Sequence, residues 1–329
     1  MNNRKRYTVL ILLLILAALT IVHVNGGKVS WPGSLLWKSI TGFDPANQDL
    51  VIFREIRIPR TLMAVLAGAG LSISGLLMQT LFNNPLAGPS VLGITSGASL
   101  FVALTMMTGV SFFASGLGVV TAALLGAIVF SAIILLFSFF VRNQVSLLLI
   151  GMMLGSFTSA VIQVIQVSSH EGKLKAYTLW GFGSLQQVNF NEIPLILLFF
   201  VIALFSMFFL IKPLNLLVIG DKSTRLLGID VKAARIGIII VSSVFAGLIT
   251  AYCGPISFIG LAVPNIVKII YKTQNHLKLL LGAAIIGGIA LLLCDLLVLW
   301  LEPYMLLPLN GVTALFGSPV VVWIILRKF

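Results

Sequence analysis

A stripe of uncharged polar side chains follows one apolar stretch of the chain, residues 145–168. Its members, at spacings of three and four residues, are Ser156, Ser159, Gln163, Gln166 and His170. On an α-helix these spacings place all of them on one narrow face. Glutamines facing lipid would leave polar groups unsatisfied, so this face must meet protein or water. The stripe predicts either the lining of a pathway for a polar ligand or a hydrogen-bonded seam between helices.

One carboxylate, Asp295, lies deep inside another apolar stretch, at 279–300. An ionisable group at membrane depth is costly and usually has a function or a partner. We expect Asp295 to form an ion pair with a neighbouring helix, and a step in a proton relay is the alternative.

Charged residues concentrate in the segment 211–235, which contains five Lys or Arg residues. Asp221 and the hydroxyl residues after it offer N-cap chemistry for a short helix. Gly228 suits a left-handed turn that would end this helix. Two short helices joined at a glycine would form a rigid knob. The segment is therefore a candidate docking site, and an ordinary basic loop is the alternative.

Two arginines, Arg57 and Arg60, bracket Pro59 at the start of a long apolar stretch. A lone arginine here would extend its charged end to the lipid headgroups. Two together can instead bind carboxylates of a partner protein, because the guanidinium group pairs with them bidentately.

Other chemistries lack the residues they need. The chain has no G-x-x-x-x-G-K-[ST] loop, so ATP hydrolysis would belong to another polypeptide. Its two cysteines form no C-x-x-C pair and its three histidines are far apart in the sequence, which gives no indication of a zinc site or a disulfide framework. We expect no cofactor and no enzymatic activity.

The composition indicates which elements must position these residues. Apolar residues make up 59% of the 329 positions and charged residues 9%, whereas a soluble domain carries about 25% charge. The chain is therefore predicted to be an all-α integral membrane protein in contact with lipid. The net charge of +12 is explained by basic residues in short loops on one side of the membrane, and not by nucleic-acid binding.

About ten apolar stretches are long enough, or nearly long enough, to span a bilayer. They lie at 7–25, 58–81, 90–108, 114–140, 145–168, 193–211, 233–252, 256–271, 279–300 and 310–327. The first is interpreted as a retained helix and not a signal peptide, and Pro213 is expected to end the sixth. With a cytoplasmic N-terminus, fourteen of the 21 Lys and Arg residues lie inside. This bias predicts a single polytopic domain, residues 1–329, with both termini in the cytoplasm.

Two sequence patterns indicate how these helices pack. Small residues recur at Ala64, Gly68 and Ser72, and such a row lets another helix approach closely. The stretch after Arg60 ends before Gly88-Pro89, and the stretch after Arg235 ends before Gly254-Pro255. With the first Gly-Pro on the cytoplasmic side and the second outside, the two units predict a weak inverted repeat, a feature common in transporters.

Several motifs resemble one family of membrane proteins over residues 50–327. They are R-I-P-R at 57–60, A-G-A-G-L-S-I-S-G-L-L-M-Q at 67–79, N-P-L-A-G-P-S-V-L-G-I-T-S-G-A at 84–98, W-G-F-G-S-L at 180–185 and the G-D segment from 220. The family is that of the FecCD, or BtuC-like, permease subunits of ABC importers for iron–siderophore complexes, haem and vitamin B12.

The resemblance implies a fold, partners and roles for residues. It implies a BtuC-like permease that works with a separate ATPase, an extracytoplasmic binding protein and a second permease subunit in the cytoplasmic membrane. ATPase coupling would fall to Asp221, Arg225, Gly228 and Asp230, and docking of the binding protein to Arg57 and Arg60. The cargo expected is an iron chelate, most simply an iron–siderophore complex. Haem or cobalamin import is the alternative, and an ion-coupled secondary transporter is the alternative from another class.

The sequence departs from the family pattern at a few positions. The family's V-P-H-x-x-R is present as Val263 to Lys268, with Asn265 in place of the histidine. An arginine that the family uses for docking is replaced by Leu299. Since a homodimer would lack this contact in both copies, a heterodimer with a related permease is expected.

Overall fold

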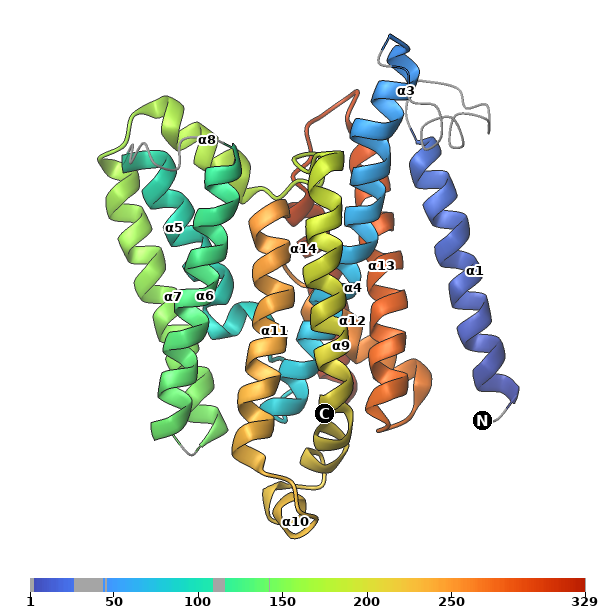
Figure 1. Cartoon of the computed structure of the whole chain (residues 1–329), viewed down its shortest axis with the longest axis vertical. Helices are drawn as coiled ribbons and strands as arrows, with labels where there is room; N and C mark the ends of the chain where they lie inside the picture. Colours follow the sequence, from blue (N-terminus) through green and yellow to red (C-terminus); the bar gives the residue numbers. More distant parts are fainter. Residues whose placement is uncertain (1–2, 27–43, 45, 109–115, 142, 329) are drawn as a thin grey trace.

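The computed structural model of the chain describes residues 3–26, 44, 46–108, 116–141 and 143–328, and every regular element in these ranges is a helix. Figure 1 shows the helices side by side in one bundle, most of them along its long axis. The predicted all-α class is confirmed.

The apolar helices correspond to the predicted stretches. Seven are long enough to cross a membrane: α1 (Asn3–Asn25), α4 (Ile58–Leu81), α6 (Gly116–Phe140), α7 (Gln144–Val167), α9 (Ile193–Leu217), α11 (Val231–Cys253) and α13 (His276–Leu301). Three have shorter apolar segments: α5 (Ile94–Thr108), α12 (Ile259–Tyr271) and α14 (Leu309–Lys328), of which the apolar part is Leu309–Ile324. The small elements between them are α3 (Gln48–Ile52), a π-helix (Phe53–Arg57), two 3-10 turns (Pro89–Leu92 and Phe190–Glu192), α8 (Glu171–Gly181) and α10 (Asp221–Leu226).

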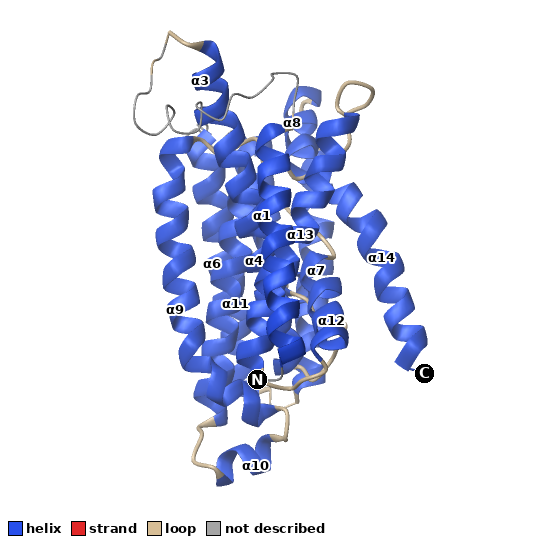
Figure 2. Cartoon of the chain, turned by 90° about the vertical axis from the view of Figure 1, so that its right-hand side faces the viewer, coloured by secondary structure: helices blue, strands red, loops and turns tan. Residues whose placement is uncertain are grey.

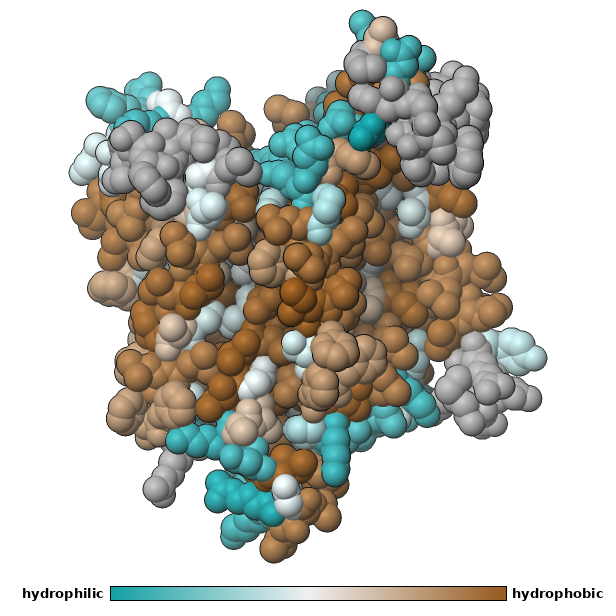
Figure 3. All heavy atoms as spheres, viewed as in Figure 1, coloured by the Kyte–Doolittle hydropathy of each residue, from teal (hydrophilic) through white to brown (hydrophobic). Residues whose placement is uncertain are grey.

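The surface has the polarity of a membrane protein. Figure 3 shows an apolar belt around the middle of the visible face, with hydrophilic residues collected at its two ends. The two chain ends and α10 lie at the same end of the bundle (Figures 1 and 2). This placement is the one that the predicted even number of crossings requires.

Helices α4 and α11 form the centre of the bundle. In their most apolar windows, 83% of α4 and 78% of α11 residues are buried. The hydroxyl group of Ser74 on α4 donates a hydrogen bond to the carbonyl oxygen of Ser242 on α11, at 3.0 Å. Because a buried hydroxyl needs a partner, this pair fixes the register of the two helices.

Glycines on α4 allow two backbones to touch it. A Cβ atom on Gly68 would lie 2.1 Å from the carbonyl oxygen of Gly287 on α13, and one on Gly75 would lie 1.6 Å from that of Gly260 on α12. The close helix approach that the small-residue rows predicted is therefore present. Any larger residue at either position would force the helices apart.

The two short helices α5 and α12 occupy corresponding places in the chain. Each follows a buried central helix and a Gly-Pro pair, and α4 and α11 run in opposite directions (Figure 1). Gly88-Pro89, expected on the cytoplasmic side, is buried, and a Cβ atom on Gly260 would lie 3.0 Å from Cδ of Pro89. Discontinuous helices meeting inside the bundle are typical of transporters built from inverted repeats.

Candidate functional site

The predicted docking segment forms a projection at one end of the bundle. Helix α10 extends past the ends of α9 and α11, at the end where the termini lie (Figure 1). Helix α9 continues through Pro213 to Leu217, so the prediction that Pro213 ends this span was wrong. Proline is tolerated inside membrane helices because neighbouring groups can satisfy the freed carbonyl.

Two glycines set the direction of the chain on either side of α10. Gly220 has φ of +109° and Gly228 has φ of +79°, a region that glycine adopts without steric cost. The left-handed turn predicted at Gly228 is confirmed. The chain then passes directly into α11, where the carboxylate of Asp230 accepts hydrogen bonds from the backbone N–H groups of Lys232 and Ala233. The second short helix of the prediction is therefore the start of a membrane span.

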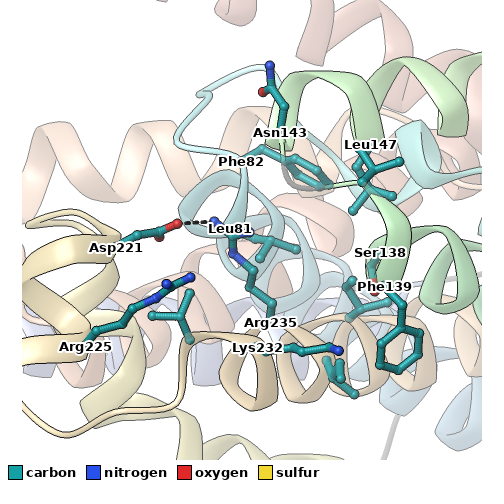
Figure 4. Close-up of a pocket in the computed structure, with 14 residues that line it drawn as sticks. Leu81, Phe82, Ser138, Phe139, Asn143, Leu147, Asp221, Arg225, Lys232 and Arg235 are labelled. Carbon is teal, nitrogen blue, oxygen red and sulfur yellow. Dashed lines mark hydrogen bonds and ion pairs between the residues drawn. The ribbon is translucent and has the colours of Figure 1, made fainter.

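Asp221 ties the projection to the bundle, but not in the way the sequence indicated. The N-cap of α10 is Gly220, and Asp221 is the first helical residue. The Asp221 carboxylate binds the guanidinium group of Arg235 on α11 (Figure 4). The hydroxyl of Thr224, which is fully buried, donates to the carbonyl of Gly220 at 2.8 Å. Helix α10 is thus held in a fixed orientation at its first turn.

The tip of the projection exposes apolar side chains next to a cation. Leu226 is 88% exposed, Leu227 57% and Ile219 64%, and Arg225 is exposed beside them. Apolar residues grouped on a polar end of a protein mark an interaction surface. The geometry suits a surface that inserts into a hollow of a partner protein.

The polar stripe lies on the outside of the chain. On α7, Ser156, Ser159 and Gln163 are exposed and Gln166 is half-buried, and His170, the N-cap residue of α8, is exposed. Only 17% of the residues in the most apolar window of α7 are buried. The stripe is therefore no seam with another helix of this chain, and its amide groups need water or a second protein.

Asp295 is the centre of a buried polar cluster at the other end of the bundle. Its carboxylate accepts hydrogen bonds from Arg60 on α4, from Nε at 2.7 Å and from Nη2 at 2.9 Å. Nε2 of His23 on α1 lies 2.8 Å from the same carboxylate, and Nδ1 of His23 lies 2.8 Å from the hydroxyl oxygen of Thr61. Asp295 therefore has the neighbouring-helix ion pair expected from the sequence, and the cluster joins α1, α4 and α13.

This cluster changes the interpretation of the arginine pair. Arg60 is 6% exposed and its guanidinium group binds Asp295 within the chain, so it is not placed to receive a carboxylate from another protein. Arg57 is half-buried at the end of the π-helix, with Nη1 3.4 Å from the carbonyl oxygen of Val24. Of the two arginines, Arg57 alone is placed for the predicted docking role.

Sequence reasoning missed the part played by His23. The residue is 2% exposed although α1 is otherwise largely exposed, with 11% of its most apolar window buried. The available signal was a lone histidine in an apolar stretch of a chain with one deeply placed carboxylate. The two residues are 272 positions apart, so nothing local in the sequence joins them.

Two positions that depart from the family pattern, Asn265 and Lys268, belong to a second polar cluster, between α4 and α12. Nζ of Lys268 donates to the side-chain oxygen of Gln79 at 2.8 Å, and the Gln79 amide donates to the carbonyl of Leu261 at 3.1 Å. The amide of Asn265 donates to the carbonyl of Pro85 at 2.8 Å. Asn265 and Lys268, at the positions where the family pattern has a histidine and an arginine, therefore support the junction of α4 and α12.

The three histidines have separate environments. His276 lies between the hydroxyl of Thr80, at 2.9 Å, and the side-chain oxygen of Asn215, at 3.0 Å. His23 belongs to the Asp295 cluster and His170 is exposed at the start of α8. Among the described residues, no three His, Cys, Asp or Glu side chains lie together as a metal site would require.

Comparisons with known proteins agree with this architecture. The family model of the FecCD transport family matches residues 10–327. The hemin transport system permease protein HmuU of Yersinia pestis is 33% identical over 100% of this chain and 98% of its own length. The vitamin B12 import system permease protein BtuC of Salmonella paratyphi A is 33% identical over 98% and 95%. A solved inward-facing structure of a metal-chelate type ABC transporter superimposes with a TM-score of 0.85, at 29% identity, over 98% of this chain and 99% of the other.

Proposed function

Since this chain belongs to the FecCD transport family and is a permease subunit of an ABC importer, we propose that its cargo is an iron chelate of the siderophore class. The observation that carries this proposal is the exposed stripe of hydroxyl and amide groups on α7. Uncharged polar groups exchange hydrogen bonds with a large polar ligand without holding it by charge. The metal-chelate type of the structural relative supports the same class of cargo. Haem and cobalamin remain the alternative cargoes.

The proposal assigns a partner to each end of the bundle. The exposed apolar tip of α10 with Arg225 docks into a separate ATPase subunit in the cytoplasm, and Asp221, Gly228 and Asp230 hold it in place. The two chain ends lie at this same end. An extracytoplasmic binding protein docks at the opposite end, where Arg57 is available.

A second permease subunit completes the pathway. Because the stripe on α7 faces outward from this chain, a facing subunit must cover it and form the other wall. We favour a related chain over a second copy of this one. Leu299 replaces a docking arginine of the family, so a homodimer would lack this positive charge in both of its subunits.

The secondary-transporter alternative loses its main support in this structure. Ion-coupled carriers keep an ionisable group in the membrane that can bind and release the coupling ion. Asp295, the acid that the sequence offered for this role, is bound to Arg60 and His23 and is 1% exposed. A carboxylate held this way is a structural element of the bundle.

An uptake experiment tests the cargo and the pathway together. The chain is expressed with its ATPase, binding protein and second permease in cells without importers of this family, and uptake of a labelled ferric siderophore, haem and cobalamin is compared. We expect the ferric siderophore to be taken up, and Gln163→Leu with Gln166→Leu to slow its uptake.

The control for this experiment changes exposed apolar residues of the same helix. Val164→Leu and Phe157→Leu, at positions 69% and 64% exposed, should leave uptake unchanged. Uptake of haem or cobalamin but not the ferric siderophore would overturn the proposed cargo. Equal uptake by the glutamine variant and the control would overturn the role of the stripe.

A further inference from the structure

The projection that carries α10 is joined to the bundle by two helices, α9 before it and α11 after it (Figure 1). On the α11 side, the Asp221 carboxylate binds Arg235. On the α9 side, the connection consists of the last turn of α9, which follows Pro213, and the residues Val218–Gly220. Because proline has no N–H group, this turn lacks one of the hydrogen bonds of a regular helix. Contacts with other helices must therefore fix its position.

Asn215, on this last turn, binds the first residue of α13. Its side-chain oxygen accepts a hydrogen bond from the backbone N–H of His276 at 2.8 Å, and Nδ1 of His276 lies 3.0 Å from the same oxygen. An amide oxygen can only accept, so Nδ1 donates to it. The first N–H groups of a helix have no acceptor within that helix, and here α9 supplies one. Two hydrogen bonds thus join the last turn of α9 to the start of α13.

His276 continues this connection to the centre of the bundle. It is 1% exposed, and its Nε2 lies 2.9 Å from Oγ1 of Thr80 on α4. The residue before Thr80 is Gln79, whose side-chain oxygen accepts a hydrogen bond from Lys268 on α12. Asn215, His276 and Thr80, which we call the His276 bridge, therefore join α9, α13 and α4. The neighbouring Gln79 extends the connection to α12.

A cavity of about 450 Å³ separates α10 from the end of α4. Thr80 of α4 and Asn83 just after it line one side, and Gly220, Asp221 and Arg235 line the other. Side-chain packing therefore does not fill the space between these two elements. The hydrogen bonds of the His276 bridge pass from α9 to α4 at the edge of this cavity. The open space leaves room for α10 to move relative to α4.

We propose that His276 is a positioning residue for ATP-driven transport, and that the His276 bridge carries movements of α10 to α4 and α12. The inference rests on the proposed docking of an ATPase subunit at α10. A force on α10 acts on the last turn of α9, which cannot shift without moving α13 and α4 or breaking the hydrogen bonds of the bridge. Helix α12 follows α4 because their backbones touch at Gly75 and Gly260. Hydrogen-bond networks and rigid helices of this kind carry coupling between distant sites.

The bridge can be tested on the complete importer, reconstituted in lipid vesicles with its second permease, ATPase and binding protein. The measurements are the ATPase retained by the complex, the increase in ATP hydrolysis caused by the loaded binding protein, and uptake of whichever cargo the unmodified importer transports. We expect His276→Ala to retain the ATPase, because the tip of α10 is unchanged. Stimulation and uptake should both fall by roughly tenfold, within the usual range of coupling between two sites.

Two conservative variants separate the two halves of the bridge. The side-chain amide of asparagine can replace Nδ1 of a histidine, and that of glutamine can replace Nε2. His276→Asn therefore keeps a donor toward Asn215, and His276→Gln keeps a partner for Thr80. Both variants should lose stimulation, because the bridge needs both halves. Full stimulation in either variant would overturn the proposal.

A double variant tests whether the two residues act through each other. Asn215→Ala alone should reduce stimulation as His276→Ala does, and the two changes together should cause little further loss, because residues in one network are not additive. Fully additive losses would show that the residues act independently and that no bridge operates.

A matched control removes a buried hydrogen bond between helices elsewhere in the bundle. Ser74→Ala removes the contact of α4 with Ser242 on α11. It should lower the unfolding temperature, since a buried hydrogen bond is lost, but leave the stimulation of ATP hydrolysis unchanged. If Ser74→Ala loses as much stimulation as His276→Ala, the effect is a general loosening of the bundle and the positioning role is wrong.

A variant of the projection tests the docking on which the bridge depends. Leu226 and Leu227 are exposed at the tip of α10, so Leu226→Ser with Leu227→Ser should release the ATPase. If this variant keeps the ATPase, the proposed docking site is wrong, and the bridge with it. If it releases the ATPase while His276→Ala is stimulated normally, the docking site stands and the bridge alone is wrong.

Discussion

At the scale of single residues, the cluster around Asp295 matters most for stability. A carboxylate, a guanidinium group and an imidazole are removed from water together, and the bidentate contact with Arg60 satisfies both carboxylate oxygens. Such a cluster adds little net stability over an apolar packing, but breaking it leaves uncompensated charge inside the protein. Substituting a single member of the cluster should therefore destabilise the protein more than replacing both members of the ion pair with apolar residues.

Asp295→Ala should lower the free energy of unfolding by about 3–5 kcal/mol, the cost of leaving the buried Arg60 without its partner. Thermal unfolding in detergent, followed by the loss of monodisperse protein, measures this effect. The double variant Asp295→Leu with Arg60→Leu should recover most of the loss, since no charge is then left unpaired. A double variant as unstable as Asp295→Ala would show that the ion pair is not what the single change disrupts.

Gly228 provides a second test at this scale, because its left-handed backbone conformation requires a glycine. Its Cβ position is open, with no atom within 4 Å, so a substitution there meets only backbone strain. Gly228→Val should cost roughly 1–2 kcal/mol locally, leave the protein in the membrane and reduce both ATPase binding and uptake.

Gly228→Asn is the matched comparison for this strain. Asparagine tolerates the left-handed region better than other residues that carry a Cβ atom, so this variant should retain more ATPase binding than Gly228→Val. Equal loss in both variants would point to the added side chain and not to the backbone angle of +79°.

At the scale of helices, the sequence predicts which stretches form helices better than it predicts where those helices are interrupted. Hydropathy is sufficient for the apolar helices because each must satisfy its own backbone in lipid. Pro213 misled the prediction because neighbouring groups can satisfy the carbonyl group that a proline leaves free in a membrane helix, and α9 continues for one more turn beyond it. The burial of Gly88-Pro89 against α12 was not predictable either, since it depends on Gly260, far away in the sequence.

Helix contact through glycine can be tested on α4. Gly68→Ala places a Cβ atom 2.1 Å from the carbonyl oxygen of Gly287, so α4 and α13 must separate. We expect a loss of about 1–3 kcal/mol in the free energy of unfolding, as for an overpacked core. Gly172→Ala, at a position with no atom within 4 Å, is the control and should be neutral. An unchanged unfolding temperature in Gly68→Ala would mean that the two helices adjust freely.

At the scale of the whole molecule, the assignment of a partner to each end of the bundle depends on which end faces the cytoplasm. In a chain with Cys253 and Cys294 replaced by alanine, Lys222→Cys on α10 and Gln186→Cys at the opposite end are both exposed positions. A membrane-impermeant thiol reagent should label position 186 in intact cells and position 222 only in opened or inverted vesicles. The reverse pattern would exchange the two faces and with them the ATPase and binding-protein surfaces.

The candidate sites were predictable to the extent that they are local in the sequence. The docking segment, its left-handed glycine and the polar stripe follow from short-range patterns. The pairing of Asp295 was expected, but its partners were not, because His23 and Arg60 lie 272 and 235 residues before it. Arg60 was consequently assigned to the surface together with Arg57, because the two are close in the sequence. Its partner Asp295, inside the bundle, could not be identified from the sequence.

The separation of these residues has a consequence for biosynthesis. During synthesis α1 and α4 enter the bilayer long before α13, so His23 and Arg60 stay without Asp295 on the order of tens of seconds at ordinary translation rates. Until then α1 has little other packing to hold it, since only 11% of its most apolar window is buried in the finished fold. A chain that stalls before α13 therefore leaves the Arg60 guanidinium group without its carboxylate at membrane depth. Asp295 completes the cluster only once α13 has been made, so truncation ahead of α13 should direct the protein to membrane proteases.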